Sequence, residues 1–172
     1  MADLIQFGAI MTAVTACPGG PRMPFFVGRQ DRTNAALDGL LPHPTDGGTT
    51  TIALFSKRSF SAGGLAALIG AHTVSQQFVA DSQHAGVSQD PTPGQLDCDY
   101  YTSTTAQTPP AGVFLFASDV FLARHGDTAG SFSFSELWAF AAEYLRLSIL
   151  GVYNLNLMKG CTGALHLSTF QE

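Results

Sequence analysis

Charged side chains are scarce in this chain of 172 residues: 12% are Asp, Glu, Lys or Arg, which is about half of the share usual for soluble domains. The eight Lys and Arg residues are scattered and form no basic run, and the net charge is −5. This excludes the electrostatic footprint of a nucleic-acid-binding protein. The length suits one domain with its own core, or part of a larger one. Low charge combined with 18 glycines and 9 prolines indicates a compact, loop-rich protein.

Cysteine is also scarce, and Cys17, Cys98 and Cys161 lack the CxxC spacing of a zinc site. An odd count indicates a free thiol or a missing partner. The N-terminal stretch "MADLIQFGAIMTAVTAC" lacks the positive charge that opens a signal peptide, and its apolar run is too short to span a membrane. We therefore expect an ordinary buried amphipathic helix there, capped by Asp3, with no targeting signal and no membrane association.

Strict alternation of apolar and polar residues is nearly absent, so the sequence predicts little strand beyond short pieces near "MPFFVG". Apolar residues recur at helical spacing instead. The predicted helices cover about residues 3–16, 61–77, 112–124 and 135–149, and Gly151 is placed to end the last one. Connections of some thirty residues separate these helices, and connections of that length tend to be functional. The predicted fold class is mainly α.

One histidine, His72, lies on the apolar face of the helix predicted for "LAALIGAHTVSQQF". Ser61 is a natural N-cap for that helix, because its hydroxyl can accept a hydrogen bond from an unpaired backbone N–H. Gly70 disfavours the helix by roughly 1 kcal/mol relative to alanine, so we expect a bulky group to approach it closely. The pattern alone favours a packed core histidine, with a metal ligand as the alternative.

Oxygen-bearing side chains cluster in "DPTPGQLD", which follows the predicted helix. Calcium takes six to eight oxygen ligands from carboxylates, hydroxyls and main-chain carbonyls. The segment and its surroundings offer that number from Thr73, Asp90, Thr92, Gln95 and Asp97. The closing glutamate of an EF-hand is absent. Taken alone, the segment favours an ordinary Asp/Pro/Gly turn with Asp caps, and the calcium site is the alternative.

A carboxylate, Asp119, follows the apolar run in "VFLFASDVFLARHGD". A buried carboxylate is costly unless it is paired, and an imidazole N–H is a suitable partner. A metal-bound histidine usually donates its second ring proton to such a carboxylate. Taken alone, Asp119 is better explained as a helix N-cap, with the imidazole partner as the alternative.

Six motifs together point to a family. They are "CPGGPRMPFFVGRQD", "DGLLPHP", "LIGAHT", "DPTPGQLD", "FASDVFLA" and "LSILGV". In this order they resemble the secreted fungal haem peroxidases, class II of the plant-type peroxidase superfamily, over nearly the whole chain. The resemblance implies the helical peroxidase fold, haem b and calcium as cofactors, and oxidation of small phenolic or similar aromatic reductants by hydrogen peroxide. It also implies an extracellular, monomeric protein.

The resemblance assigns roles to individual residues. His72 corresponds to the proximal haem-iron ligand, and Asp119 to the carboxylate that accepts its second ring proton. Thr73, Asp90, Thr92, Gln95 and Asp97 correspond to the proximal calcium site, which would clamp the loop that leaves the ligand helix. Cys17 corresponds to a cysteine whose disulfide partner lies upstream in the family, and the pairing of Cys98 with Cys161 stays open.

The sequence also departs from the family. The distal Arg-x-x-Phe-His pattern does not occur in it, so we expect the C-terminal part of a peroxidase: residues 1–31 from the end of the distal half, and residues 32–172 as the proximal half of a single incomplete domain. Peroxide cleavage by this chain alone should be poor. His43 is expected in a turn near the haem edge rather than as a general base. Ala67 and Phe78 stand where specialised members carry a redox tryptophan and an acidic manganese ligand, which argues against both activities.

Three hypotheses follow. The first is a haem-dependent peroxidase of which this chain supplies the proximal ligand and the calcium site. The second is a truncated fragment that binds haem and calcium without turnover. The third is a helical interaction module in which His72 and Asp119 are only core residues.

Overall fold

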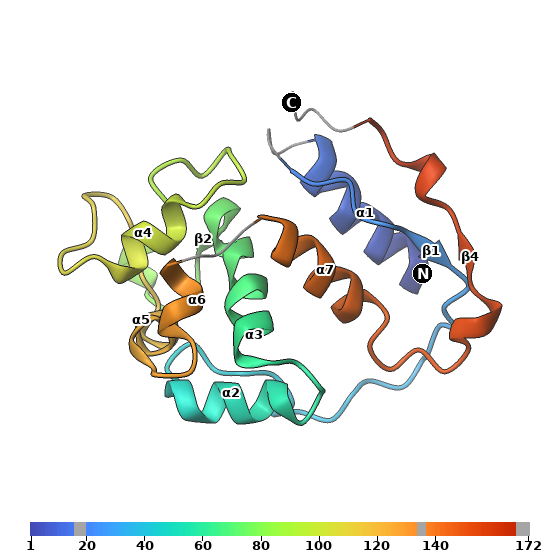
Figure 1. Cartoon of the computed structure of the whole chain (residues 1–172), viewed down its shortest axis with the longest axis horizontal. Coiled ribbons are helices and arrows are strands. Elements are labelled where there is room, and N and C mark those ends of the chain that lie inside the picture. The colour runs from blue at the N-terminus through green and yellow to red at the C-terminus, as the bar shows by residue number, and fades with distance from the viewer. Residues whose placement is uncertain (16–19, 134–136, 168–172) are drawn as a thin grey trace.

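The computed structural model describes residues 1–15, 20–133 and 137–167. Helices dominate this part of the chain (Figure 1), which confirms the predicted mainly α class. The α-helices are α1 Ala2–Thr15, α2 Gly48–Ser56, α3 Ala62–Ile69, α4 Asp99–Thr105, α5 Ala117–Arg124, α6 Ala129–Ser133 and α7 Leu137–Ser148. Short 3₁₀ helices occupy Gly70–Val74, Ser82–His84, Leu155–Leu157 and Thr162–Ala164.

Helix α3 is the central element of the structure (Figure 1). It packs against α7 on one side and against α2 and α6 on the other. Two buried clusters hold the elements together. The first joins α1 to α7 and to the C-terminal segment through Ile10, Val14, Met23, Phe25, Leu96, Phe140 and Leu165. The second joins α3 to α4, α5 and α6 through Leu65, Ala66, Tyr100, Tyr101, Leu122, Ala123 and Phe132.

Strands are few and short, as the lack of alternation predicts. The strand β1 (Phe26–Val27), within "MPFFVG", pairs antiparallel with β4 (Lys159–Gly160) near the C-terminus. The strand β2 (Gln76–Gln77) pairs antiparallel with β3 (Val87–Ser88) in the register Gln76↔Ser88. The second ribbon folds the segment after α3 back toward the helix, which matters for the site.

The N-terminal helix forms where it is predicted, but two expectations about it are wrong. Asp3 does not cap it: its carboxylate accepts hydrogen bonds from the Gly28 and Arg29 backbone N–H groups instead. The Ala2 N–H donates to Asp31 at 2.6 Å, so a residue distant in sequence satisfies the helix start. The helix is also not buried throughout, because Leu4 and Ile5 are 63% and 64% exposed.

The helix predicted over residues 61–77 is shorter than expected. Ser61 caps it as predicted, accepting the Gly64 N–H at 2.9 Å. The α-helix then tightens to a 3₁₀ helix at Gly70, and residues 76–77 are strand. The helix predicted over 112–124 begins only at Ala117.

The last predicted helix corresponds to α7; the start predicted for it, at residues 135–136, lies outside the described residues. Gly151 follows α7 with φ +74°, a left-handed conformation suited to a chain leaving a helix. Cys17 also lies outside the described residues. Cys161 carries a free thiol, so it does not pair with Cys98. Among the described residues, no helix is both long and apolar enough to cross a bilayer.

Candidate functional site: a histidine–carboxylate pair at an apolar cavity

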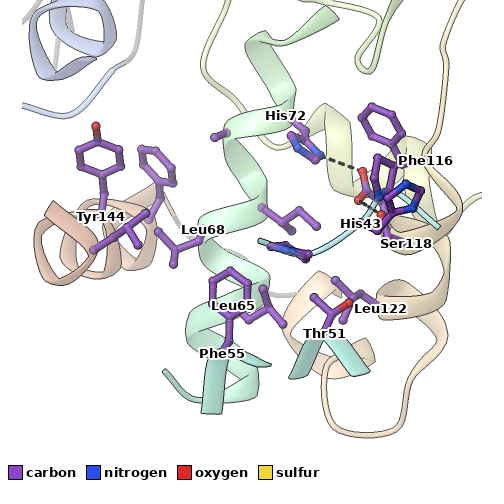
Figure 2. A pocket seen from close by; sticks show the side chains of 17 residues that line it. His43, Thr51, Phe55, Leu65, Leu68, His72, Phe116, Ser118, Leu122 and Tyr144 are labelled. Carbon is purple, nitrogen blue, oxygen red and sulfur yellow. Dashed lines mark hydrogen bonds and ion pairs between the residues drawn. The ribbon is translucent and has the colours of Figure 1, made fainter. Parts of the chain in front are cut away.

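A cavity of about 360 Å³ opens between α3, α5 and α7, and the turn at residues 42–44 closes one side of it. Figure 2 shows the predicted face of α3 turned into this space, with Leu65 and Leu68 pointing toward it. Most of the lining is apolar: Pro42, Pro44, Phe55, Leu65, Leu68, Ile69, Ala71, Phe116, Leu122, Phe140 and Leu147. The remaining lining residues are His43, Thr51, His72, Ser118, Asp119 and Tyr144. Such a cavity suits an apolar ligand that makes one or two polar contacts.

His72 stands at the wall of this cavity on the 3₁₀ turn that continues α3. Its side chain is 30% exposed, so it is not a fully packed core residue. Its Nδ1 atom lies 2.8 Å from Oδ2 of Asp119 (Figure 2). Because Nδ1 is engaged by the carboxylate, Nε2 is the ring nitrogen available to a ligand.

Asp119 holds the histidine from the first turn of α5. Its side chain is 1% exposed, and Ser118 Oγ donates to its second oxygen at 3.2 Å. Phe116, not Asp119, occupies the N-cap position of α5, so the alternative role as a helix cap is wrong. The position still suits a carboxylate, since negative charge is favoured in the first turn of a helix.

Gln89 is a site residue that the sequence pattern did not identify. It is 1% exposed, and its Nε2 lies 3.2 Å from His72 Nδ1 and 3.3 Å from Asp119 Oδ2. The ribbon β2–β3 places it there: the Gln89 N–H donates to the Ser75 carbonyl, which continues the ladder by one pair. Its adjacency to Asp90 is the only signal in the sequence that could have found it.

Tyr100 packs against the other side of the histidine, with the two ring centroids 5.7 Å apart and the rings nearly perpendicular. Burial raises the pKa of Tyr100 well above its ordinary value, and the negative charge of Asp119 raises it further. The hydroxyl is buried and has no hydrogen-bond partner in the part of the chain that the structure describes. Tyr100 is therefore a neutral wall of the site.

The five oxygen-bearing residues predicted as a metal site do come together. Thr73 Oγ1 donates to Asp90 Oδ2 at 2.7 Å and lies 3.3 Å from Asp97 Oδ1. Thr92 Oγ1 lies 2.7 Å from Asp90 Oδ1 and 2.9 Å from Asp97 Oδ2. The Gln95 carbonyl oxygen is 3.5 Å from Thr73 Oγ1. Because Thr73 follows His72 directly, this cluster is attached to the histidine turn.

The donor set fits a hard cation. Asp90 is fully buried, and no Lys, Arg or His within the described ranges forms an ion pair with it. A buried carboxylate needs compensating charge, which a cation among these oxygens would supply. The described residues contain no cluster of three His, Cys, Asp or Glu side chains that could hold a metal. A set of two carboxylates completed by neutral oxygens is compatible with calcium but not with zinc.

The other three residues discussed from the sequence are His43, Ala67 and Phe78. His43 lies in a turn and lines the cavity, with its Nδ1 2.8 Å from Thr45 Oγ1. Ala67 is buried in α3, and Phe78 is 61% exposed beyond β2. Neither of the last two side chains carries a metal ligand or an indole.

Most of this chain is similar in sequence to known proteins. Residues 1–136 match the protein family described as Peroxidase. The chain is 33% identical over 144 residues to versatile peroxidase VPS1 of Pleurotus eryngii, covering 74% of this chain and 38% of that protein. It is 31% identical over 172 residues to manganese peroxidase 3 of Phlebia radiata, covering 87% and 47%. It is also 31% identical over 142 residues to a low-redox potential peroxidase of Taiwanofungus camphoratus, covering 74% and 43%.

The chain therefore belongs to the peroxidase family. Its relatives place it in the fungal, plant-type branch of that family, as the motifs predict. The chain spans less than half the length of these curated relatives. Its mainly α structure is that of a partial peroxidase fold.

Proposed function

We propose that this chain is the haem- and calcium-binding part of a haem peroxidase that uses hydrogen peroxide. The observation that carries the proposal is the pairing of His72 with Asp119 at 2.8 Å on the wall of an apolar cavity. An imidazole whose outer nitrogen is held by a buried carboxylate is a typical arrangement for a ligand to haem iron. The peroxidase relatives support the same function.

The residues present fit haem b. The apolar side chains of α3, α5 and α7 would contact the porphyrin faces and edge, and His72 Nε2 would bind the iron. When bound, haem supplies the electron transfer between peroxide and reductant; the chain binds it and adjusts its electronic properties. Asp119 accepts a hydrogen bond from the Nδ1–H of His72. This bond fixes the ring orientation and increases the electron density that the ring donates.

Calcium is the second proposed cofactor. The ligands would be Thr73, Asp90, Thr92, Gln95 and Asp97, with carbonyls contributing from at least Thr73 and Gln95. Its role would be positional. Thr73 is the neighbour of His72 and is fully buried among the two aspartates, so a cation there would hold the histidine turn in place.

The reductants proposed for the whole protein are small phenols and similar aromatic compounds. Ala67 and Phe78 provide no redox indole and no acidic manganese ligand, although one relative is a manganese peroxidase. We also propose the organisation that the motifs indicate, with residues 1–31 ending the distal half and residues 32–172 forming the proximal half. An extracellular location is part of the same proposal.

One observation favours binding without turnover as the second candidate. Splitting a bound peroxide needs a positioned acid–base group and positive charge. The residues that line the cavity in the described part of the chain include no arginine or lysine. The second histidine of the lining, His43, lies in an exposed turn, where its side chain is hydrogen-bonded to Thr45. In this second candidate, the chain on its own would bind haem and calcium without turnover.

The test is a haem titration of the purified chain with calcium present. We expect a sharp ferric Soret band in the wild type and in the His166→Ala control, whose side chain is exposed and remote from the cavity. His72→Ala should lose the band. A Soret band that is absent from the wild type, or indifferent to His72→Ala, would contradict the proposal. Adding hydrogen peroxide and a phenol to the loaded chain then separates the two candidates by turnover.

A further inference from the structure

Gln89 is buried beside both members of the histidine–carboxylate pair, and no role in the proposed function uses it. We propose that Gln89 is a positioning residue that donates a second N–H to Asp119 and thereby weakens the hold of Asp119 on the His72 Nδ1 proton. This inference rests on the proposed haem-binding function and deepens it, because it names the residue that sets how strongly the ligand histidine donates to iron.

The direction of the Gln89 amide follows from its neighbours. Ser75 Oγ hydrogen-bonds to Gln89 Oε1 on one side. On the other side, the amide group stands 3.3 Å from Asp119 Oδ2. An ionised carboxylate only accepts hydrogen bonds, so the NH₂ group, not the amide oxygen, belongs beside Asp119.

Two donors then meet at one oxygen. His72 Nδ1 lies 2.8 Å and Gln89 Nε2 3.3 Å from the same Oδ2 atom. With its proton directed to Asp119, Nδ1 cannot also accept from Gln89, although the two nitrogens are 3.2 Å apart. The Gln89 N–H is therefore directed to the carboxylate.

The consequence is a weaker acceptor for the histidine. The Oδ2 atom of Asp119 is then shared by two donors, so its negative charge is directed less fully to the His72 Nδ1–H. Asp119 therefore withdraws less of the Nδ1 proton, and His72 keeps more neutral imidazole character. Hydrogen bonding around the axial ligand is one of the means by which a protein sets the reduction potential of haem.

The backbone leaves Gln89 little freedom to take another position. The β2–β3 ladder continues to the Gln89 N–H, which donates to the Ser75 carbonyl at 3.2 Å. The side chain is 1% exposed, so its amide cannot turn to water. A buried amide needs hydrogen-bond partners, and Ser75 and Asp119 supply them.

The first experiment compares Gln89→Met with wild type in the haem-loaded chain. Methionine keeps the approximate length of glutamine and removes its N–H, and Gln83→Met, on an exposed side chain, is the matched control. We expect Gln89→Met to lower the ferric/ferrous midpoint potential and to raise the iron–histidine stretching frequency in resonance Raman spectra. The control should match the wild type. An unchanged or higher potential in Gln89→Met would overturn the proposal.

The second experiment needs neither haem nor a core substitution. In the haem-free wild-type chain, NMR should detect a scalar coupling between the Gln89 side-chain nitrogen and the Asp119 carboxyl carbon. Its absence, with the Gln89 amide protons at the shift of exposed glutamines, would also overturn the inference. If this coupling is present but no Soret band depends on His72, the proposed function fails while the hydrogen bond stands.

Discussion

Tyr101 lies directly over Gly70, so that a Cβ atom added at Gly70 would be 2.3 Å from the tyrosine hydroxyl oxygen. The hydroxyl donates to the Ala66 carbonyl at 2.9 Å and contacts that of Ala67 at 3.3 Å, at the end of α3. This is the bulky approach that the sequence predicts for the glycine before His72. Tyr101 belongs to α4, so its contact with Gly70 determines how closely the turn that carries His72 approaches α4.

Gly70→Ala should therefore destabilise the chain. The backbone at Gly70 is helical, with φ −56°, so alanine would suit it by propensity alone. The Tyr101 ring cannot move away freely, because it packs on Phe132 with ring centroids 5.4 Å apart. We expect a loss of about 1–3 kcal/mol in the free energy of unfolding, as is typical of overpacked cores, measured by urea denaturation.

Gly8→Ala is the matched control for that measurement. Gly8 is exposed in α1, and a Cβ there would meet nothing within 4 Å. Alanine should stabilise this helix by about 0.5–1 kcal/mol. Equal effects of the two substitutions would show that Tyr101 does not constrain Gly70.

The neighbouring tyrosines should respond oppositely to loss of their hydroxyls. The Tyr100 hydroxyl is buried and unpartnered among the described residues, so Tyr100→Phe should stabilise the chain by about 1 kcal/mol by removing an unsatisfied polar group. Tyr101→Phe loses the bond to Ala66 and should cost about 0.5–1.5 kcal/mol. Urea denaturation at pH 7 checks both, and destabilisation by Tyr100→Phe would mean that its hydroxyl has a partner in solution.

The sequence allowed a prediction of the histidine–carboxylate pair and the oxygen cluster because their residue types are chemically specific. A histidine on an apolar helical face and a carboxylate within an apolar run each need a partner, and each is the partner that the other needs. The two residues lie 47 positions apart in sequence. The prediction that they are in contact therefore depended on the family resemblance and not on a local sequence pattern.

Gln89 could not be predicted in the same way. Its position depends on the pairing of β2 with β3, two strands of two residues each, which are too short for an alternating pattern. Helices α2 and α4 escaped prediction for a related reason. Their sequences, "GTTTIALFS" and "DYYTSTT", are rich in threonine, a weak helix former. They are helical because α2 packs against α3 and α5, and α4 packs against α5 and α6.

Replacement of Asp119 should weaken haem binding. In Asp119→Ala, the Nδ1–H of His72 loses its hydrogen-bond acceptor, and the imidazole ring is no longer held in one orientation. Substitutions of the group that orients a metal-bound histidine typically cost about 10–100-fold in metal affinity. Haem titration followed at the Soret band measures this, and Asp127→Ala, at a 70% exposed carboxylate, should bind as the wild type does. A dissociation constant unchanged by Asp119→Ala would contradict the proposed role.

Calcium should stabilise the wild-type chain and not the Asp90→Asn variant. A ligand that binds only the folded state adds about 2.7 kcal/mol when its concentration is 100 times the dissociation constant. Asp90→Asn removes a buried charge from the oxygen cluster, so its stability should be similar with calcium and with a chelator. Asp38→Asn, at an exposed position, should keep the full calcium effect. Thermal unfolding with and without calcium checks this, and a wild type indifferent to calcium would contradict the site.

Stability should also fall in acid through Asp3. Partial burial raises the pKa of Asp3, but hydrogen bonds from Gly28 and from the Arg29 guanidinium and backbone outweigh it, so the pKa lies below the ordinary 3.8. A carboxyl with a lowered folded pKa contributes stability that is complete above its unfolded value, about 3.9. That contribution is lost as the pH falls from this value through the lower folded pKa.

Asp3→Asn isolates this contribution. Arg29 also donates to the Ser148 carbonyl at 3.0 Å, so the Asp3–Arg29 pair ties α1 to the end of α7. At pH 7 the variant should lose about 1–2 kcal/mol, the range of a charge-assisted hydrogen bond. As the pH falls through the lowered folded pKa of Asp3, wild type and variant should converge, because protonated Asp3 and asparagine are both neutral. Urea denaturation across pH 2–7 measures the difference; a gap that persists in acid would assign the effect to packing rather than to charge.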